Sequence, residues 1–299
     1  MSLEPAAFAT DLGLPGLFDV HTHFLPPRVM AKVRQQFDTA GPLIGSTWPL
    51  EYRGPDEELV ATLRGLGVRR FSSLPYAHKP GMAEFLNHWS VGFADRTPGC
   101  LRSATFYPEP GAASYVAQRL EAGAEIFKVH VQVGGFDVRD PLLSEVWGVL
   151  EDAGVPVVIH AGSGPVGTPY TGPGPVADLL QAHPRLALVI AHLGAPEYAE
   201  FLALAEVYER VLVDTTMVFT PFFDGLGAAY PAALLPRLRE LQPKVLLGSD
   251  YPNIPYPYAE QLAGLVRLDL GDDWLRDVCW RNAVRLFGES ESSPGRSSP

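Results

Sequence analysis

Short apolar runs alternate with longer amphipathic stretches along almost the whole chain. Eight runs rich in Val, Ile, Leu and Phe have the length and composition of β-strands. They cover 17–21, 68–74, 100–106, 125–131, 155–160, 186–192, 210–215 and 244–249. Eight segments with a helical pattern, several ending in Gly or Pro, follow at 55–67, 81–96, 111–123, 141–154, 174–184, 195–209, 231–243 and 256–268.

Eight strand–helix units with mostly apolar strands predict a parallel (β/α)8 TIM barrel in the α/β class. An open doubly wound sheet is the structural alternative, but the Gly-x-Gly-x-x-Gly turn expected after its first strand is missing; His-Thr-His stands there instead. We expect one catalytic domain over 1–287. An irregular insertion at about 38–54 is a candidate cover for the site, and the small, polar residues 288–299 predict a disordered tail.

Composition narrows the class of protein. The chain has 299 residues, a formal net charge of −11 and no cluster of Lys and Arg, which argues against nucleic acid or an anionic membrane as a partner. No apolar run approaches the roughly 20 residues of a membrane span, and the N-terminus does not read as a signal peptide. Two cysteines are too few for a disulfide framework. We therefore expect a cytoplasmic globular protein.

Polar side chains gather where the predicted strands end. These strand exits carry His21, His23, His130, His160, His192 and Asp250, with Lys128 two residues before His130. One polar residue after a strand is ordinarily a cap or a turn residue. In a TIM barrel, however, all strand exits meet at one rim, where active sites are built. Several imidazoles and a carboxylate on one rim favour Zn²⁺ or another divalent transition metal.

Five sequence stretches carry a resemblance to a known family. They read FDVHTHFLP, IFKVHVQVGGFDVRDP, VPVVIHAG, LVIAHLG and LLGSDYPN, and the resemblance spans roughly residues 17–287. The chain resembles the amidohydrolase superfamily, in particular the amidohydrolase-related branch that also contains aminocarboxymuconate-semialdehyde-type decarboxylases. The resemblance implies that one divalent metal, most simply Zn²⁺, is bound by His21, His23, His160 and Asp250. It also implies that His192 faces the substrate.

These residues favour a metal-dependent hydrolase that cleaves an amide, ester or lactone-type bond in a small molecule. A metal-activated water would attack, Asp250 would carry its proton, and His192 would orient the nucleophile or hydrogen-bond the attacked oxygen. Lys128, His130 and Tyr107 are candidates for substrate binding or for support of the ligands. The preference for hydrolysis rests on the Lys-x-His pattern of the fourth strand, which resembles the family's hydrolases.

Three alternatives remain open at this stage. Non-oxidative decarboxylation of an unsaturated or aromatic carboxylate would need a cationic partner, for which Lys128, His130, Arg53 and Arg102 are candidates. In a binuclear site, Lys128 would be carbamylated and His192 would hold a second ion; more simply, Lys128 pairs with a carboxylate such as Asp19. A non-catalytic metal-binding barrel is the third alternative. The substrate, the metal and the oligomeric state, including a homodimer, stay open.

Overall fold

The computed structural model describes residues 3–41 and 45–288, and within them eight strands follow the predicted order. These are β1 (Leu17–Asp19), β2 (Val68–Phe71), β3 (Ser103–Thr105), β4 (Ile126–His130), β5 (Val157–His160), β6 (Leu188–Ile190), β7 (Val211–Asp214) and β8 (Val245–Leu246). Each lies inside the range predicted for it. All are shorter than predicted because residues at one or both ends of each apolar run lie outside the hydrogen-bonded ladder.

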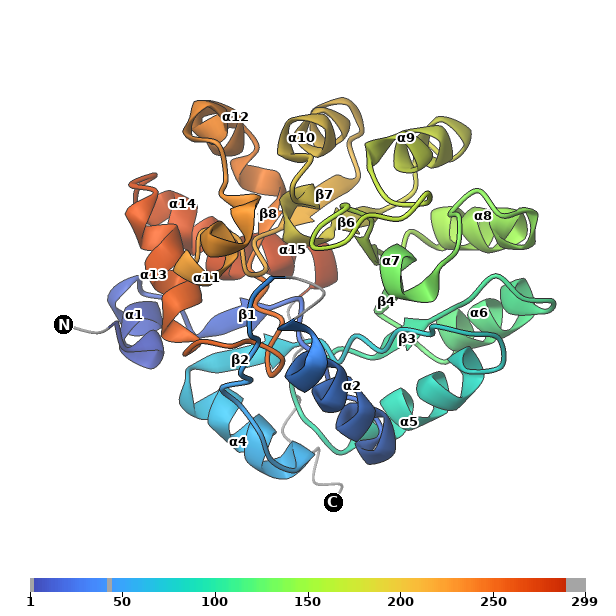
Figure 1. The fold of residues 1–299 in the computed structure, drawn as a ribbon, viewed down its shortest axis with the longest axis horizontal. Coiled ribbons are helices and arrows are strands. Elements are labelled where there is room, and N and C mark those ends of the chain that lie inside the picture. The colour runs from blue at the N-terminus through green and yellow to red at the C-terminus, as the bar shows by residue number, and fades with distance from the viewer. Residues whose placement is uncertain (1–2, 42–44, 289–299) are drawn as a thin grey trace, which may run out of the picture.

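The strands form a closed ring of parallel neighbours. β1 pairs with β2, and β3 to β8 pair in chain order, always in parallel. Two backbone hydrogen bonds join these groups: Leu101 N donates to Phe71 O at 2.7 Å, and Val20 N donates to Leu247 O at 2.9 Å. The second bond connects the first strand to the last. The predicted TIM barrel is therefore confirmed, and Figure 1 shows its strands inside a ring of helices.

Helices cover the outside of the strands (Figure 1). Each of the eight predicted segments corresponds to one: α4 (Asp56–Gly65), α5 (Ala83–Asp95), α6 (Ala112–Glu121), α8 (Ser144–Ala153), α9 (Pro173–Ala182), α10 (Tyr198–Val207), α12 (Leu235–Glu240) and α13 (Ala259–Arg267). The remaining helices are α1 (Pro5–Asp11), α2 (Pro27–Thr39), α7 (Val131–Gly134), α11 (Pro221–Phe223), α14 (Asp272–Arg276) and α15 (Asn282–Phe287). Among the described helices, none is long and apolar enough to cross a membrane.

Two apolar cores determine where along the barrel axis the polar residues lie. The larger core lies between strands and helices, and the smaller one includes Phe18, Ile126 and Val158 with Ala283 and Phe287 of α15. The helix α15 therefore closes one end of the barrel. On β4, alternate residues share a face, so Lys128 and His130 follow Ile126 toward the other end. The polar side chains thus stand above an apolar plug.

The predicted insertion at 38–54 begins at the end of α2, and its residues 42–44 lie outside the described residues. The stretch from 45 onward packs on the loop after β8, where Trp48 Nε1 donates to Asn253 O at 2.8 Å. The Trp48 ring also contacts Phe37 and Phe222. The segment therefore lies against the loop that begins at Asp250. Of the predicted disordered tail, residues 289–299 lie outside the described residues.

Candidate active site

The chain leaves β1 through His21, Thr22 and His23. Backbone hydrogen bonds hold this exit in place: His23 N donates to Tyr251 O at 2.7 Å, and Thr22 N donates to Ser72 Oγ at 3.1 Å. The rings of His21 and His23 lie side by side with centroids 5.1 Å apart, and both are buried. The one-residue spacing therefore delivers two imidazoles to one place.

Asp250, in the loop after the last strand β8, contacts both imidazoles. Its Oδ1 lies 2.9 Å from His23 Nε2 and 3.3 Å from His21 Nε2. Its backbone is left-handed, with φ of 73°, a conformation that costs energy for a non-glycine residue and often marks a functional site. One ligand atom from each of His21, His23 and Asp250 lies within 4.8 Å of the other two.

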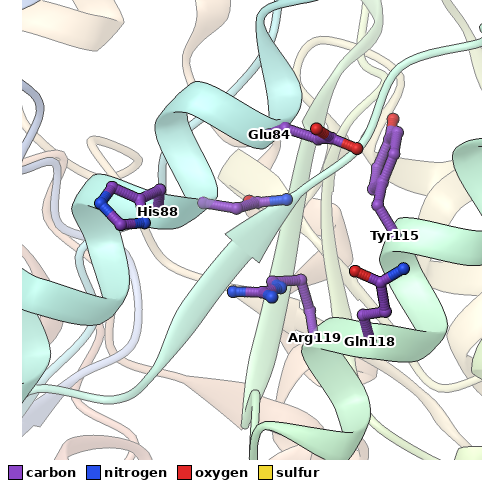
Figure 2. A pocket seen from close by; sticks show the side chains of 6 residues that line it. Glu84, His88, Tyr115, Gln118 and Arg119 are labelled. Atoms are coloured by element: carbon purple, nitrogen blue, oxygen red, sulfur yellow. The ribbon is translucent and has the colours of Figure 1, made fainter.

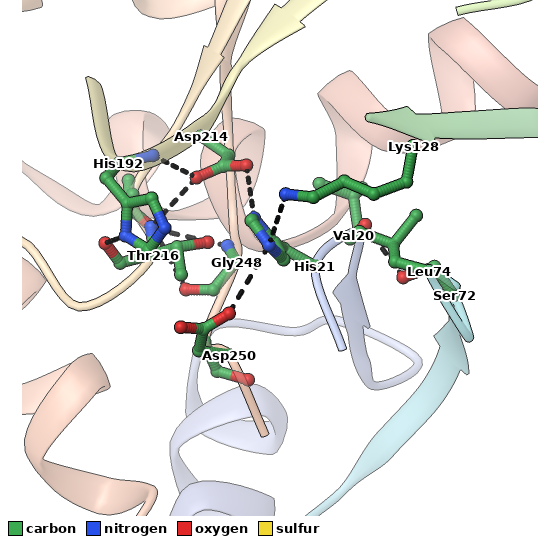
Figure 3. Close-up of polar contacts among 12 residues, drawn as sticks. Val20, His21, Ser72, Leu74, Lys128, His192, Asp214, Thr216, Gly248 and Asp250 are labelled. Carbon is green, nitrogen blue, oxygen red and sulfur yellow. Dashed lines mark hydrogen bonds and ion pairs between the residues drawn. The ribbon is translucent and has the colours of Figure 1, made fainter. Parts of the chain in front are cut away.

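The second nitrogen of each ring is already occupied. His21 Nδ1 lies 2.8 Å from Asp214 Oδ2, and His23 Nδ1 lies 2.9 Å from Leu74 O (Figure 3 shows the surroundings of His21). Since a carbonyl oxygen can only accept, His23 Nδ1 carries the hydrogen, and in the neutral ring Nε2 presents a lone pair. Lone pairs of nitrogen and carboxylate oxygen thus converge, which favours a cation between them. Two imidazoles and a carboxylate fit a divalent transition metal.

The ionised state of the Asp250 and Asp214 carboxylates also favours a bound cation. Burial by itself raises the pKa of Asp250, yet the close contact with His23 and the nearby His21 and His192 hold it well below its usual value. Burial likewise raises the pKa of Asp214, but the contact with His21 holds it below normal. Both carboxylates are therefore negative at neutral pH and attract a cation.

Lys128 is the buried cation nearest these groups, and its Nζ lies 3.0 Å from His21 Nε2. Burial lowers the pKa of Lys128 to about 8, and the charges of Asp250 and Asp214 act against that shift. The interpretation of Lys128 as a partner of Asp19 is wrong. Asp19 Oδ2 instead accepts from Ser249 Oγ at 2.5 Å and from Tyr258 OH at 2.9 Å.

Three further histidines line the exits of β4, β5 and β6. His160 lies between the other two, with its ring centroid 3.9 Å from that of His130 and 4.7 Å from that of His192. His160 Nε2 bonds Gly164 O at 3.2 Å, and His192 Nδ1 bonds Thr216 O at 3.0 Å. Burial lowers the pKa of all three rings, so they are neutral at pH 7. His160 is not part of the His21–His23–Asp250 group.

Other candidates lie away from this group. Tyr107 OH donates to Gly134 O at 3.1 Å, and its ring packs on Phe136, so it stands beside α7 rather than at the ligands. Arg53 and Arg102 form exposed ion pairs with Asp38 and Asp95. These contacts give no support to their interpretation as partners of a substrate carboxylate, which stays a prediction.

A hollow of about 200 Å³ lies between α5 and α6, apart from the strand exits (Figure 2). Its lining includes Glu84, His88, Arg119 and Asn87. The Asn87 amide exchanges hydrogen bonds with the Thr105 backbone in both directions, so it has a structural task. We assign the hollow no catalytic role.

Sequence reasoning overlooked Asp214, which is wholly buried at the end of β7. Its Oδ2 faces His21 Nδ1, and its Oδ1 accepts from His192 N at 2.9 Å and from Thr216 N at 3.1 Å. The signal was present, because Asp214 lies at the exit of a predicted strand, as His160 and Asp250 do.

These observations define a TIM-barrel enzyme with a potential metal site at the carboxyl ends of its strands. The chain belongs to the amidohydrolase family, whose model matches residues 18–288. The resemblance read from the strand exits is thereby confirmed. No curated protein sequence matches the chain.

Solved structures share the fold at low sequence identity. A TIM-barrel protein from Bordetella bronchiseptica is 18% identical with a TM-score of 0.72, covering 90% of this chain and 98% of its own. The 5-carboxyvanillate decarboxylase of Sphingomonas paucimobilis is 16% identical with a TM-score of 0.64, covering 91% and 99%. A probable 2-pyrone-4,6-dicarboxylic acid hydrolase from Acinetobacter baumannii is 14% identical with a TM-score of 0.59, covering 92% and 100%. At these identities the likeness concerns the fold.

Proposed function

We propose that this protein is a metal-dependent hydrolase that cleaves an amide, ester or lactone-type bond in a small molecule. The observation that carries the proposal is the convergence of His21 Nε2, His23 Nε2 and Asp250 Oδ1 while both ring Nδ1 atoms are bound elsewhere. His160 completes the proposed ligand set through Nδ1, because its Nε2 is engaged with Gly164 O. We propose one ion, Zn²⁺, since the described residues form a single such group.

Asp250 and His192 have separate roles in the proposed hydrolysis. A divalent ion bound there supplies Lewis-acid character and acidifies water. Among the described residues Asp250 Oδ2 has no hydrogen-bond partner, so it is free to accept the proton of the attacking water and pass it to the leaving group. Thr216 O can only accept, so neutral His192 carries its hydrogen on Nδ1 and presents an Nε2 lone pair that orients the same water.

The substrate oxygen needs a donor, and His130 can provide one. Val133 N donates to His130 Nδ1 at 3.3 Å, which leaves the hydrogen of the neutral ring on Nε2. We propose that His130 Nε2 and the Lys128 ammonium stabilise negative charge on substrate oxygen. Tyr107, held beside α7, is proposed as a further substrate-binding residue.

Decarboxylation of an unsaturated or aromatic carboxylate is the second candidate. The buried Lys128 cation favours it, because it is placed to attract a carboxylate. The fold is shared by a decarboxylase and by a probable 2-pyrone-4,6-dicarboxylic acid hydrolase, so the fold does not separate the two reactions.

Turnover in ¹⁸O-labelled water separates them. The metal-loaded protein is screened with lactones, amides and aromatic carboxylates, and products are analysed by mass spectrometry. Hydrolysis places the label in the product acid. Release of CO₂ with uptake of a solvent proton at carbon, and no hydrolysed product, would replace hydrolase with decarboxylase. Turnover by the chelator-treated protein at the same rate would remove the metal from either mechanism.

A further inference from the structure

The side chain of Asp214 connects two histidines that come from different strands. Its Oδ2 lies 2.8 Å from His21 Nδ1, although the two residues are 193 positions apart in the chain. Its Oδ1 accepts the backbone hydrogens of His192 and Thr216. Both oxygens of this wholly buried carboxylate are therefore used, and Figure 3 shows it between the rings of His21 and His192.

The contacts of His21 specify its tautomer from both sides. A carboxylate can only accept, so the Asp214 contact places the hydrogen on Nδ1. The Lys128 ammonium can only donate, so its contact with Nε2 requires a lone pair on that nitrogen. A ligand ring is commonly oriented in this way, by a carboxylate bound to the nitrogen that the metal does not use.

His192 depends on the same carboxylate through its backbone. His192 and Leu193 both have left-handed backbones, with φ of 55° and 52°, which L-residues adopt at a cost. The hydrogen bond from His192 N to Asp214 Oδ1 stabilises this turn where β6 ends. The turn brings the His192 ring within 5.4 Å of the His21 ring, measured between centroids.

We propose that Asp214 is a shared positioning residue: it presents the Nε2 lone pair of His21 to the metal and sets the turn that carries His192. The metal part of this inference rests on the proposed function, whereas the tautomer and the turn do not. Asp214→Asn is the informative variant. Asn can keep a carbonyl oxygen toward the two backbone N–H groups, but it then offers an amide hydrogen to His21 Nδ1. That contact favours the wrong tautomer, with the hydrogen on Nε2.

The matched control is Asp19→Asn. Asp19 is also a wholly buried carboxylate close to His21, but it accepts from the His21 backbone N at 3.1 Å and from two hydroxyls, and touches no imidazole. An Asn there keeps these bonds because the hydroxyls of Ser249 and Tyr258 can accept as well as donate. Both variants replace a buried carboxyl group by a carboxamide, and only the one at Asp214 faces a ligand ring.

Two measurements on the full-length protein test the proposal. Long-range ¹H–¹⁵N NMR of ¹⁵N-histidine-labelled protein, with His21 assigned through a His21→Gln variant, reports which ring nitrogen carries hydrogen. We expect Nδ1–H in the wild type and in Asp19→Asn, and Nε2–H in Asp214→Asn. Competition with a chromophoric chelator for Zn²⁺ should show affinity lowered about 10- to 100-fold in Asp214→Asn and unchanged in Asp19→Asn.

The outcomes separate the positioning role of Asp214 from general disruption of the fold and from the proposed metal-dependent function. An Nε2–H tautomer of His21 in the wild type overturns the proposal even if Asp214→Asn does not fold. So does equal loss of zinc affinity in the two Asn variants, which would indicate general disruption. If the tautomers are as expected but no variant and no wild-type chain binds zinc, the positioning role stands and the proposed metal-dependent function fails.

Discussion

His23 and Asp250 are 227 positions apart in the chain, yet His23 Nε2 lies 2.9 Å from Asp250 Oδ1. The contact joins the exit of the first strand to the exit of the last. It exists because the barrel closes, with Val20 N bonded to Leu247 O just before the two exits. The candidate metal site is therefore assembled only when the barrel closes.

Replacing Asp250 by Asn should remove both of its proposed tasks. The Asn side chain keeps the shape but loses the charge and the proton-accepting oxygen. We expect kcat to fall by about 10²- to 10⁴-fold, in line with the usual contribution of general acid–base catalysis. Zinc content after dialysis should also fall. The exposed Asp152 of α8 supplies the control, and Asp152→Asn should alter neither quantity. Full activity of Asp250→Asn would contradict the assignment.

His160 and His192 should respond differently to substitution by Asn. His160 is proposed as a ligand, so His160→Asn should lower metal content measured by elemental analysis. His192 is proposed to orient water, so His192→Asn should lower kcat with metal content unchanged. If His192→Asn strips the metal as thoroughly as His160→Asn does, the site holds two ions, and Lys128 becomes the candidate bridging residue.

Gly248 leaves room for His21, and an added methyl group should disturb it. A Cβ at Gly248 would lie 2.1 Å from Thr216 Oγ1, 2.9 Å from His21 Cβ and 3.3 Å from Asp214 Cγ. We expect Gly248→Ala to lower the free energy of unfolding by about 1–3 kcal/mol, as overpacking does, and to weaken zinc binding. Urea unfolding and chelator competition measure the two effects.

Gly148 of α8 is the matched control for Gly248. A Cβ at Gly148 meets nothing within 4 Å, and Ala is the better helix former, so Gly148→Ala should be neutral or slightly stabilising. Equal destabilisation by the two substitutions would show that the packing around His21 has no special requirement for glycine.

Asp19 should make the stability of the metal-free protein depend on pH. Burial raises the pKa of Asp19 from 3.8 to about 7, against the hydrogen bonds from Ser249, His21 N and Tyr258. The folded chain therefore binds more protons at this residue than the unfolded chain between about pH 4 and pH 7. Since stability falls wherever the folded state binds more protons, this contribution decreases as the pH rises through that window.

Asp19→Asn removes this titration and should gain stability relative to the wild type as the pH rises. The difference between 3.8 and about 7 sets an upper limit of roughly 4 kcal/mol at 1.36 kcal/mol per pKa unit. Urea unfolding of both chelator-treated proteins at about pH 4, 6 and 8 measures the trend. A stability difference that does not change with pH would show that Asp19 is ionised throughout.

The sequence by itself determined the order of strands and helices, because apolar periodicity reports burial locally. It also indicated the exits of β1, β5, β6 and β8, since polar residues after buried strands are visible without contacts. The helices α1, α14 and α15 are among those that lie outside the eight predicted helical segments. The role of α15 in closing one end of the barrel depends on packing against Phe18 and Ile126, which are far away in the chain.

Only the tertiary structure decided which polar groups meet. Lys128 faces His21 rather than Asp19, and Asp214 faces both His21 and the His192 backbone. Arg53 and Arg102, which had the right charge for a substrate carboxylate, are paired at the surface. A sequence pattern shows on which strand a side chain stands. A hydrogen bond that selects a tautomer forms only if two side chains are placed to within a few tenths of an ångström. That placement is set when the ring of strands closes and packs.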